Sequence, residues 1–147
     1  ILSTELAGCP ALEPIESYPD SIPGGILAFV LKYRAEHAGN WPRGAFVKAA
    51  VAEGVPVSVD YYRPLHRRAL FNLASFGNYG GALRSYSDRQ QQPAAPDDLT
   101  TTEEVCQQLV TVTPMTKVSP DLVRQCAQAL RKVANGAAQI KDLRTGR

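Results

Sequence analysis

The residues of this 147-residue sequence that are best suited to binding lie close together, in the segment GVPVSVDYYRPLHRRALF at positions 54–71. Its first half alternates valine with smaller or polar residues, which is typical of a half-buried strand. Its second half gathers phenol hydroxyls, an imidazole and guanidinium groups, which are better suited to meeting a ligand than to filling a core. These residues are Tyr61, Tyr62, Arg63, His66, Arg67 and Arg68, called here the Tyr61–Arg68 cluster.

Each member of the Tyr61–Arg68 cluster also has a purely structural interpretation. Tyr61 would continue the buried valine face of the strand, and His66 would cap a short helix. The arginines would be solvated, because exposed arginines and buried aromatic residues are common in folded proteins. Both interpretations stay open for each residue, and we expect at least one member of the cluster to contact a ligand.

Other reactive side chains are less well placed for catalysis. Lys32 alternates out of an apolar strand and Lys48 lies on a helix, so neither is expected to be a Schiff-base lysine. His37 lies in a turn and is expected to be exposed. Glu103 and Glu104 are neighbours on a helix, where adjacent side chains face different sides, so they do not form an acid–base pair. We therefore expect no catalytic residue in this chain.

The composition excludes several classes of protein. A net charge of +2, from 16 basic and 14 acidic residues, gives no reason to expect a nucleic-acid or membrane partner. The cysteines, Cys9, Cys106 and Cys126, lack both CxxC spacing and partnering histidines, so buried reduced thiols are expected rather than disulfides or a metal site. With no apolar run near the roughly 20 residues that span a bilayer and no signal-peptide layout, we expect a cytoplasmic protein.

The hydrophobic pattern predicts three strands and four helical segments. The most apolar segment, GILAFVLKYRAE at 25–36, is expected to be a central strand. Further strands are expected at 55–62 and 109–114, and helices at 43–53, 64–72, 101–107 and from Pro120 onward. The segment at 9–24 contains four prolines and is expected to be an irregular connection.

The helices also carry specific expectations. Pro42 suits the first helical position before Arg43, and Gly54 suits a left-handed C-cap. Ser119 suits the N-cap of the last helix, and the stretch at 141–147 is expected to fray. The residues expected to face inward are Ala45, Phe46, Ala49, Ala50, Leu65, Ala69 and Leu70, and in the last helix Leu122, Val123, Cys126, Ala127, Leu130, Val133 and Ala134.

The order of these elements predicts an α+β fold. Its simplest form is a small antiparallel sheet of about three strands, covered by helices, with the long C-terminal helix packed on one face. A chain of this length is expected to make a single domain over residues 1–147. Residues 72–98 are rich in glycine, proline and polar residues and are expected to form a long exposed loop.

Three segments in order resemble one enzyme family. These are LAGCPAL, RGAFVKAAVAEGVPVSVDYYRPLHRRALF and EEVCQQLVTVTPMTKVSPDLVRQCAQALRKV, and the match spans residues 6–133. They are similar to the C-terminal region of the DegT/DnrJ/EryC1/StrS aminotransferases, which depend on pyridoxal phosphate and act mostly on nucleotide-linked keto-sugars and related cyclitols.

The resemblance implies that this chain corresponds to a small C-terminal domain. It implies a missing N-terminal domain that holds pyridoxal phosphate, a homodimer, a keto-sugar substrate and an amino donor. It also implies that Tyr61, Tyr62, Arg63, His66 and Arg67 contact the substrate. No residue here matches the family's cofactor lysine, so the chain alone is expected to be inactive and to bind no cofactor.

A second function, from a different class, stays open. The chain would then be a stand-alone α+β module that binds a ligand or a partner without catalysis. A cofactor lysine encoded upstream of Ile1 would separate the two hypotheses, because only the aminotransferase requires it.

Overall fold

The structure is a computed structural model that describes residues 1–15, 17–22, 24, 27–59, 64–67 and 99–145, with side chains to residue 137. The chain divides into two compact units. The first, called the sheet unit, consists of residues 1–61 and 108–147, and the second consists of residues 62–107. The expected loop at 72–98 lies outside the described residues, so that loop and the single domain stay predictions.

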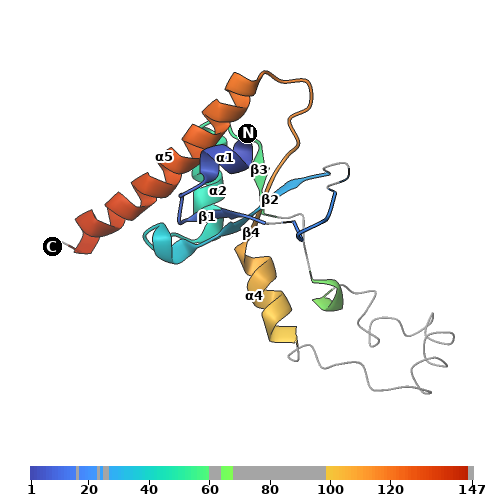
Figure 1. The fold of residues 1–147 in the computed structure, drawn as a ribbon. Helices are drawn as coiled ribbons and strands as arrows, with labels where there is room; N and C mark the ends of the chain where they lie inside the picture. The colour runs from blue at the N-terminus through green and yellow to red at the C-terminus, as the bar shows by residue number, and fades with distance from the viewer. Residues whose placement is uncertain (16, 23, 25–26, 60–63, 68–98, 146–147) are drawn as a thin grey trace, which may run out of the picture. The chain divides into compact units, whose positions relative to one another are not determined.

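The sheet unit contains four antiparallel strands in the order β1-β2-β4-β3. Their bounds are β1 (Leu12–Pro14), β2 (Phe29–Tyr33), β3 (Val57–Ser58) and β4 (Leu109–Val112). This confirms the α+β fold and the three expected strands, of which β2 and β4 are interior (Figure 1). The expected number of three strands is wrong, because β1 forms within the segment expected to be irregular.

Strand β1 was not predicted, because its segment contains a proline, Pro14, which disfavours a strand. Pro14 lacks a backbone N–H, which is tolerated on the edge of a sheet, and β1 is an edge strand. Leu12 lies opposite Tyr33, and Pro14 lies opposite Leu31. Pairing with β2 therefore decides the conformation of this segment against its local sequence.

The register places apolar side chains on one face of the sheet. Leu31 of β2 lies between Pro14 of β1 and Val110 of β4, and Phe29 lies opposite Val112. Side chains alternate between the two faces of a strand, so these residues share a face. Leu31, Val110 and Val112 are fully buried there, which places the core on this side.

Three helices cover the core: α1 (Leu2–Leu6), α2 (Arg43–Ala52) and α5 (Pro120–Thr145). Both α1 and α2 contact α5, and they also contact β1 and β3, respectively (Figure 1). The short 3-10 helix η1 (Ala35–His37) follows β2. The helix α1 was not predicted. No helix among the described residues is long and apolar enough to cross a bilayer.

Helix α2 agrees closely with the helix predicted at 43–53. Gly54 follows it with a φ of +87°, the left-handed conformation expected of a C-cap glycine. Pro42 is the N-cap instead of the first helical residue. Ala45 is exposed and Val47 is buried, so the predicted inward face is wrong at these positions.

Helix α5 confirms the predicted cap, because Ser119 Oγ accepts a hydrogen bond from the backbone N–H of Leu122 at 3.3 Å. The buried residues of the predicted stripe are Cys126, Ala127, Leu130, Val133 and Ala134, and Val123 packs against the core. Leu122 is 42% exposed, so its assignment to the stripe is wrong. The expected fraying is wrong as far as Thr145, because an established helix gains one hydrogen bond for each residue added.

Two short elements are described in the second unit: the 3-10 helix η2 (Leu65–Arg67) and the helix α4 (Thr100–Gln108), whose last residue belongs to the sheet unit. Both were predicted as helical segments. Leu65 is 63% exposed, so the expectation that it faces inward is wrong. In this single 3-10 turn it is His66 that is partly buried.

Candidate functional site

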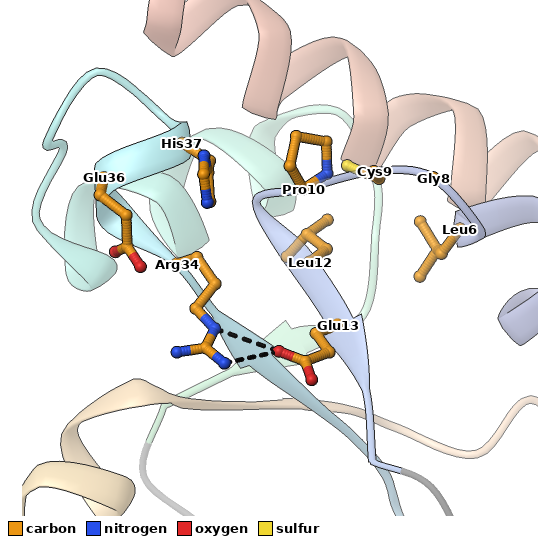
Figure 2. Close-up of a pocket in the computed structure, with 9 residues that line it drawn as sticks. All are labelled: Leu6, Gly8, Cys9, Pro10, Leu12, Glu13, Arg34, Glu36 and His37. Atoms are coloured by element: carbon orange, nitrogen blue, oxygen red, sulfur yellow. Dashed lines mark hydrogen bonds and ion pairs between the residues drawn. The ribbon is translucent and has the colours of Figure 1, made fainter.

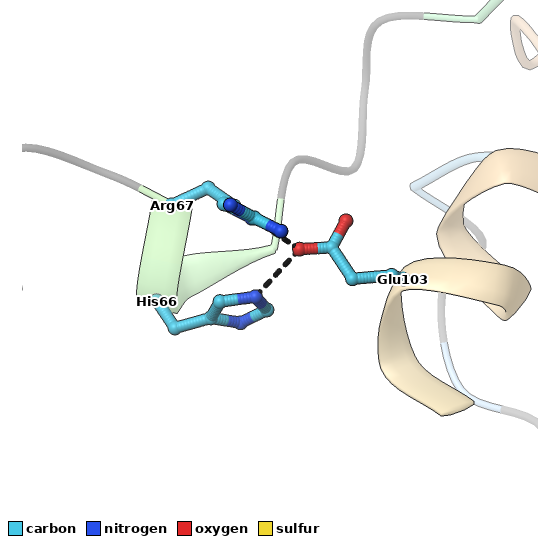
Figure 3. A network of polar contacts seen from close by, with 3 residues as sticks. All are labelled: His66, Arg67 and Glu103. Atoms are coloured by element: carbon cyan, nitrogen blue, oxygen red, sulfur yellow. Dashed lines mark hydrogen bonds and ion pairs between the residues drawn. The ribbon is translucent and has the colours of Figure 1, made fainter. Parts of the chain in front are cut away.

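Three side chains of the second unit form a polar network: His66 and Arg67 of η2, and Glu103 of α4 (Figure 3). His66 Nε2 lies 2.6 Å from Glu103 Oε1, and Arg67 Nε lies 2.5 Å from the same oxygen. We call these residues the His66–Arg67–Glu103 network. It joins residues that are 36 and 37 positions apart in the sequence.

The local backbone explains how the two donors come together. Pro64 precedes η2, and its carbonyl oxygen accepts a hydrogen bond from the backbone N–H of Arg67 at 3.1 Å. This closes a tight turn in which His66 and Arg67 are consecutive. Glu103 lies in the first turn of α4, where the helix dipole stabilises a negative charge.

The electrostatics assign the donors and the acceptor. The guanidinium of Arg67 and the imidazole of His66, which both hydrogen-bond Glu103, hold the pKa of that carboxyl below its usual value of 4.5. Glu103 is therefore ionised at neutral pH, and an ionised carboxylate can only accept. The Nε2–H of His66 is therefore assigned as the donor of this hydrogen bond, and Glu103 Oε1 as its acceptor.

The network is reached by solvent mainly from the side of Arg67. The Arg67 side chain is 53% exposed, compared with 15% for His66 and 24% for Glu103. Ion pairs with this exposure contribute little to stability, because solvent screens them. The network therefore contributes little to the stability of the fold, and it directs a guanidinium N–H and an imidazole N–H at one point.

The predicted site residues fall into two groups. Tyr61, Tyr62, Arg63 and Arg68 lie outside the described residues, so their roles stay predictions. His66 and Arg67 are brought together by the structure and share Glu103. The imidazole of His66 contacts the carboxylate of Glu103, which lies on α4. The interpretation of His66 as a cap of its own short helix did not include this contact.

Sequence reasoning considered Glu103 only as a partner for Glu104 and missed its place in the network. Glu104 is exposed and Glu103 is partly buried, consistent with the expected difference in direction. No short motif links Glu103 to His66, because the contact depends on where α4 begins. Covariation between the two positions would have been the signal.

A cavity of about 460 Å³ lies in the sheet unit, between η1 and the start of β1 (Figure 2). Its charged lining includes Arg34, whose Nε and Nη2 donate to Glu13 Oε2 at 3.1 and 2.8 Å. The hydrogen bond and charge of Arg34 lower the pKa of Glu13. His37 and Cys9 also line the cavity, with His37 exposed and Cys9 buried.

This cavity is a weaker candidate than the His66–Arg67–Glu103 network. In its wall a single arginine, Arg34, pairs with Glu13, as Figure 2 shows, whereas in the network donors from two residues converge on one oxygen. Among the described residues, no group of three His, Cys, Asp or Glu side chains is placed to hold a metal ion. The cavity is therefore large enough for a small ligand, but its described charged side chains do not converge on one point.

The lysines considered for catalysis do not form a cofactor site. Lys32 lies opposite Glu13 of β1 and Leu109 of β4, on the face of the sheet away from the helices. Lys48 is exposed on α2. Lys32 is only partly buried, so neither lysine lies in a desolvated pocket of the kind that activates a Schiff-base lysine.

The remaining expectations on cysteine are largely confirmed. Cys9, Cys106 and Cys126 are free thiols. Cys9 and Cys126 are buried, and burial raises the pKa of the Cys126 thiol. Cys106 is only partly buried. Low thiolate content makes Cys126 unreactive, so it serves as a small apolar residue of the core.

Comparison with known proteins gives one informative likeness. No family model matches the sequence, and no curated protein matches it. The fold is similar to a crystal structure of DesI in the presence of its TDP-sugar product, with a TM-score of 0.61 and 18% sequence identity. The likeness covers 98% of this chain and 31% of the DesI chain. This chain therefore shares the fold of about a third of DesI.

Proposed function

We propose that this chain is the small C-terminal domain of a pyridoxal-phosphate-dependent aminotransferase that transfers an amino group to a nucleotide-linked keto-sugar or related cyclitol. The single observation that carries the proposal is the fold likeness to DesI over nearly the whole chain. The DesI structure was determined with a TDP-sugar product, which is a nucleotide-linked sugar. The ordered motifs that resemble the sugar aminotransferases support the same function independently.

The domain's contribution would be to bind substrate. His66 and Arg67 are hydrogen-bond donors directed at one anionic oxygen, and a nucleotide-linked sugar carries phosphate oxygens of this kind. Arg67 is accessible to a ligand. Tyr61, Tyr62 and Arg63, close in the sequence, would add hydroxyl and guanidinium contacts to the sugar or the phosphates.

The cofactor would be held by the rest of the enzyme. Pyridoxal phosphate requires a lysine in a protected site, and the described lysines do not offer one: Lys48 is exposed, and Lys132 pairs with Glu53 at 2.8 Å. The proposed enzyme therefore needs a large N-terminal domain as partner, and we propose a homodimer in the cytoplasm. No step of the amino transfer is assigned to residues of this chain.

The experiment that tests the proposal uses the product of the full reading frame that encodes this chain. The purified protein is incubated with pyridoxal phosphate, and the absorbance of lysine-bound cofactor is recorded. Amino transfer is then assayed with TDP-linked keto-sugars and glutamate as amino donor. The proposal requires both cofactor binding and turnover, and Arg67→Ala is expected to raise KM for the sugar more than it lowers kcat.

Two results would contradict the proposal. A reading frame without an upstream lysine that binds the cofactor would favour the stand-alone binding module. Cofactor binding with turnover of keto acids but not of nucleotide-linked sugars would place the protein among aminotransferases of another substrate class. Lys48→Ala serves as the matched control, because this exposed lysine is expected to change neither result.

A further inference from the structure

Glu103 occupies the position at which the two donors of the network converge. A single oxygen, Oε1, accepts from both His66 Nε2 and Arg67 Nε, at 2.6 and 2.5 Å (Figure 3). Charge-assisted donors that meet at one point form the arrangement with which proteins bind phosphate or carboxylate oxygens. The carboxylate therefore stands where an anionic oxygen of a ligand would bind.

We propose that Glu103 is a displaceable internal anion, and that a phosphate group of the substrate takes its place between His66 and Arg67. The nucleotide diphosphate as the ligand rests on the proposed function. The exchange itself rests only on the geometry of the network, and any phosphate with two or more charges would produce it.

Displacement is feasible because the donors and the carboxylate belong to different elements. His66 and Arg67 lie on η2, and Glu103 lies on α4. A change of side-chain rotamer at Glu103 can withdraw the carboxylate without moving either backbone. The exposed Arg67 allows a ligand to approach, and solvent screening makes the ion pair weak enough to exchange.

The exchange would give the site selectivity by charge. The carboxylate holds the two donors in place before the ligand arrives, so less side-chain freedom is lost on binding. A singly charged anion gains little by displacing Glu103, because it carries no more charge than the carboxylate that it replaces. A diphosphate carries more charge and more acceptor oxygens, so it displaces Glu103 where chloride or acetate does not.

The test measures binding of inorganic pyrophosphate, and separately of TDP, to the full-length protein by calorimetry. Glu103→Gln removes the competing charge and is expected to tighten pyrophosphate binding about fivefold, the upper range for an exposed ion pair. Glu104→Gln makes the same charge change at an exposed neighbour and is the matched control, expected to change binding less than twofold. Arg67→Ala is expected to abolish binding.

A second measurement follows the Glu103 carboxyl resonance by NMR. Adding pyrophosphate to the wild type is expected to raise the pKa of this carboxyl toward its usual value, because the displaced group loses both donors. Adding acetate at the same ionic strength is expected to leave it unchanged. This readout would not move if Glu103 only supported the local fold.

Several outcomes would overturn the inference. These are equal effects of Glu103→Gln and Glu104→Gln, weaker pyrophosphate binding in Glu103→Gln, or a Glu103 resonance that ignores pyrophosphate. Failure of the proposed function is distinguishable from this failure. Tighter pyrophosphate binding by Glu103→Gln, in a protein that binds no pyridoxal phosphate, supports the exchange and rejects the aminotransferase.

Discussion

Arg131 of α5 donates a hydrogen bond from Nη1 to the backbone carbonyl oxygen of Glu5 at 2.8 Å, and the same nitrogen lies 3.0 Å from the carbonyl oxygen of Ala7. The last carbonyl groups of a helix have no partner within the helix. Arg131 therefore caps the C-terminal end of α1 from a position more than 120 residues later in the chain. Arg131 thus links the short first helix to the long last one, alongside the ion pair of Arg124 with Glu5 at 3.6 Å.

Replacing Arg131 is expected to destabilise the sheet unit. Arg131→Met keeps the apolar stem and removes the donors, leaving the two carbonyl oxygens without them. The expected cost is about 1.5–3 kcal/mol, the range for hydrogen bonds to a charged group. Urea unfolding measures it. Arg124→Met is the control, because Arg124 also links α5 to Glu5 of α1 but through an exposed ion pair at 3.6 Å, and it pairs with Asp121 on its own helix; its loss is expected to cost less than about 1 kcal/mol.

Tyr33 is expected to make stability depend on alkaline pH. Its ring stacks on Phe46 with centroids 4.7 Å apart, and its hydroxyl donates to the carbonyl oxygen of Trp41 at 3.0 Å. Burial, and secondarily the charge of Glu36, raises the pKa of Tyr33 to about 12 from its usual value of 10. The neutral hydroxyl is therefore favoured in the folded state, so this contribution is complete below pH 10 and is lost as the pH rises to 12.

The measurement compares the unfolding free energy of the wild type and Tyr33→Phe from pH 8 to 12. At pH 8, the variant is expected to be less stable by about 1 kcal/mol, because it lacks the hydrogen bond. Above pH 10 the wild type is expected to lose stability more steeply, so the difference narrows. Parallel pH profiles for the two proteins would contradict the assigned pKa of Tyr33.

Two glycines at the ends of α2 are expected to respond to alanine in opposite directions. Gly54 has a φ of +87°, which an L-residue rarely adopts, so Gly54→Ala is expected to cost about 1 kcal/mol. Gly44 lies inside the helix with nothing within 4 Å of an added Cβ, so Gly44→Ala is expected to stabilise by about 0.5 kcal/mol. Thermal unfolding of both variants checks the pair, and equal signs would reject the C-cap assignment.

The acidity of Glu103 is expected to depend on Arg67 first and His66 second. Arg67→Ala is expected to raise the pKa of Glu103 toward 4.5, and His66→Ala to raise it less. A carboxyl whose pKa is lowered in the folded state stabilises the fold when the pH is above the usual pKa of the group. That contribution is lost as the pH falls through the lowered pKa. NMR titration of the Glu103 carboxyl measures the shift. An unchanged pKa in both variants would show that the network does not form in solution.

The elements that the sequence predicted well are those whose local signals and burial agree. Helix α5 begins with the expected cap at Ser119 and buries the expected residues around Leu130. Strand β2 was recognised from its apolar run, and Gly54 from its position after a helix. In each case, the residue preferences and the tertiary environment favour the same conformation.

The elements that the sequence did not predict depend on distant partners. Strand β1 contains Pro14 and becomes a strand only by pairing with β2. Helix α1 has five residues, too few to be stable alone, and depends on Arg131 and its contacts with α5. The candidate site was half predicted for the same reason, since His66 and Arg67 are adjacent but Glu103 comes from α4.

The antiparallel pairing of β3 with β4 has a consequence for how the sheet can respond to changes in chain length. Ser58 lies opposite Thr111, so the two strands form a hairpin whose connection carries the whole second unit. The entropy of closing such a connection grows only slowly with its length. Lengthening or shortening the connection between the two strands is thus expected to change the stability of the sheet only slightly.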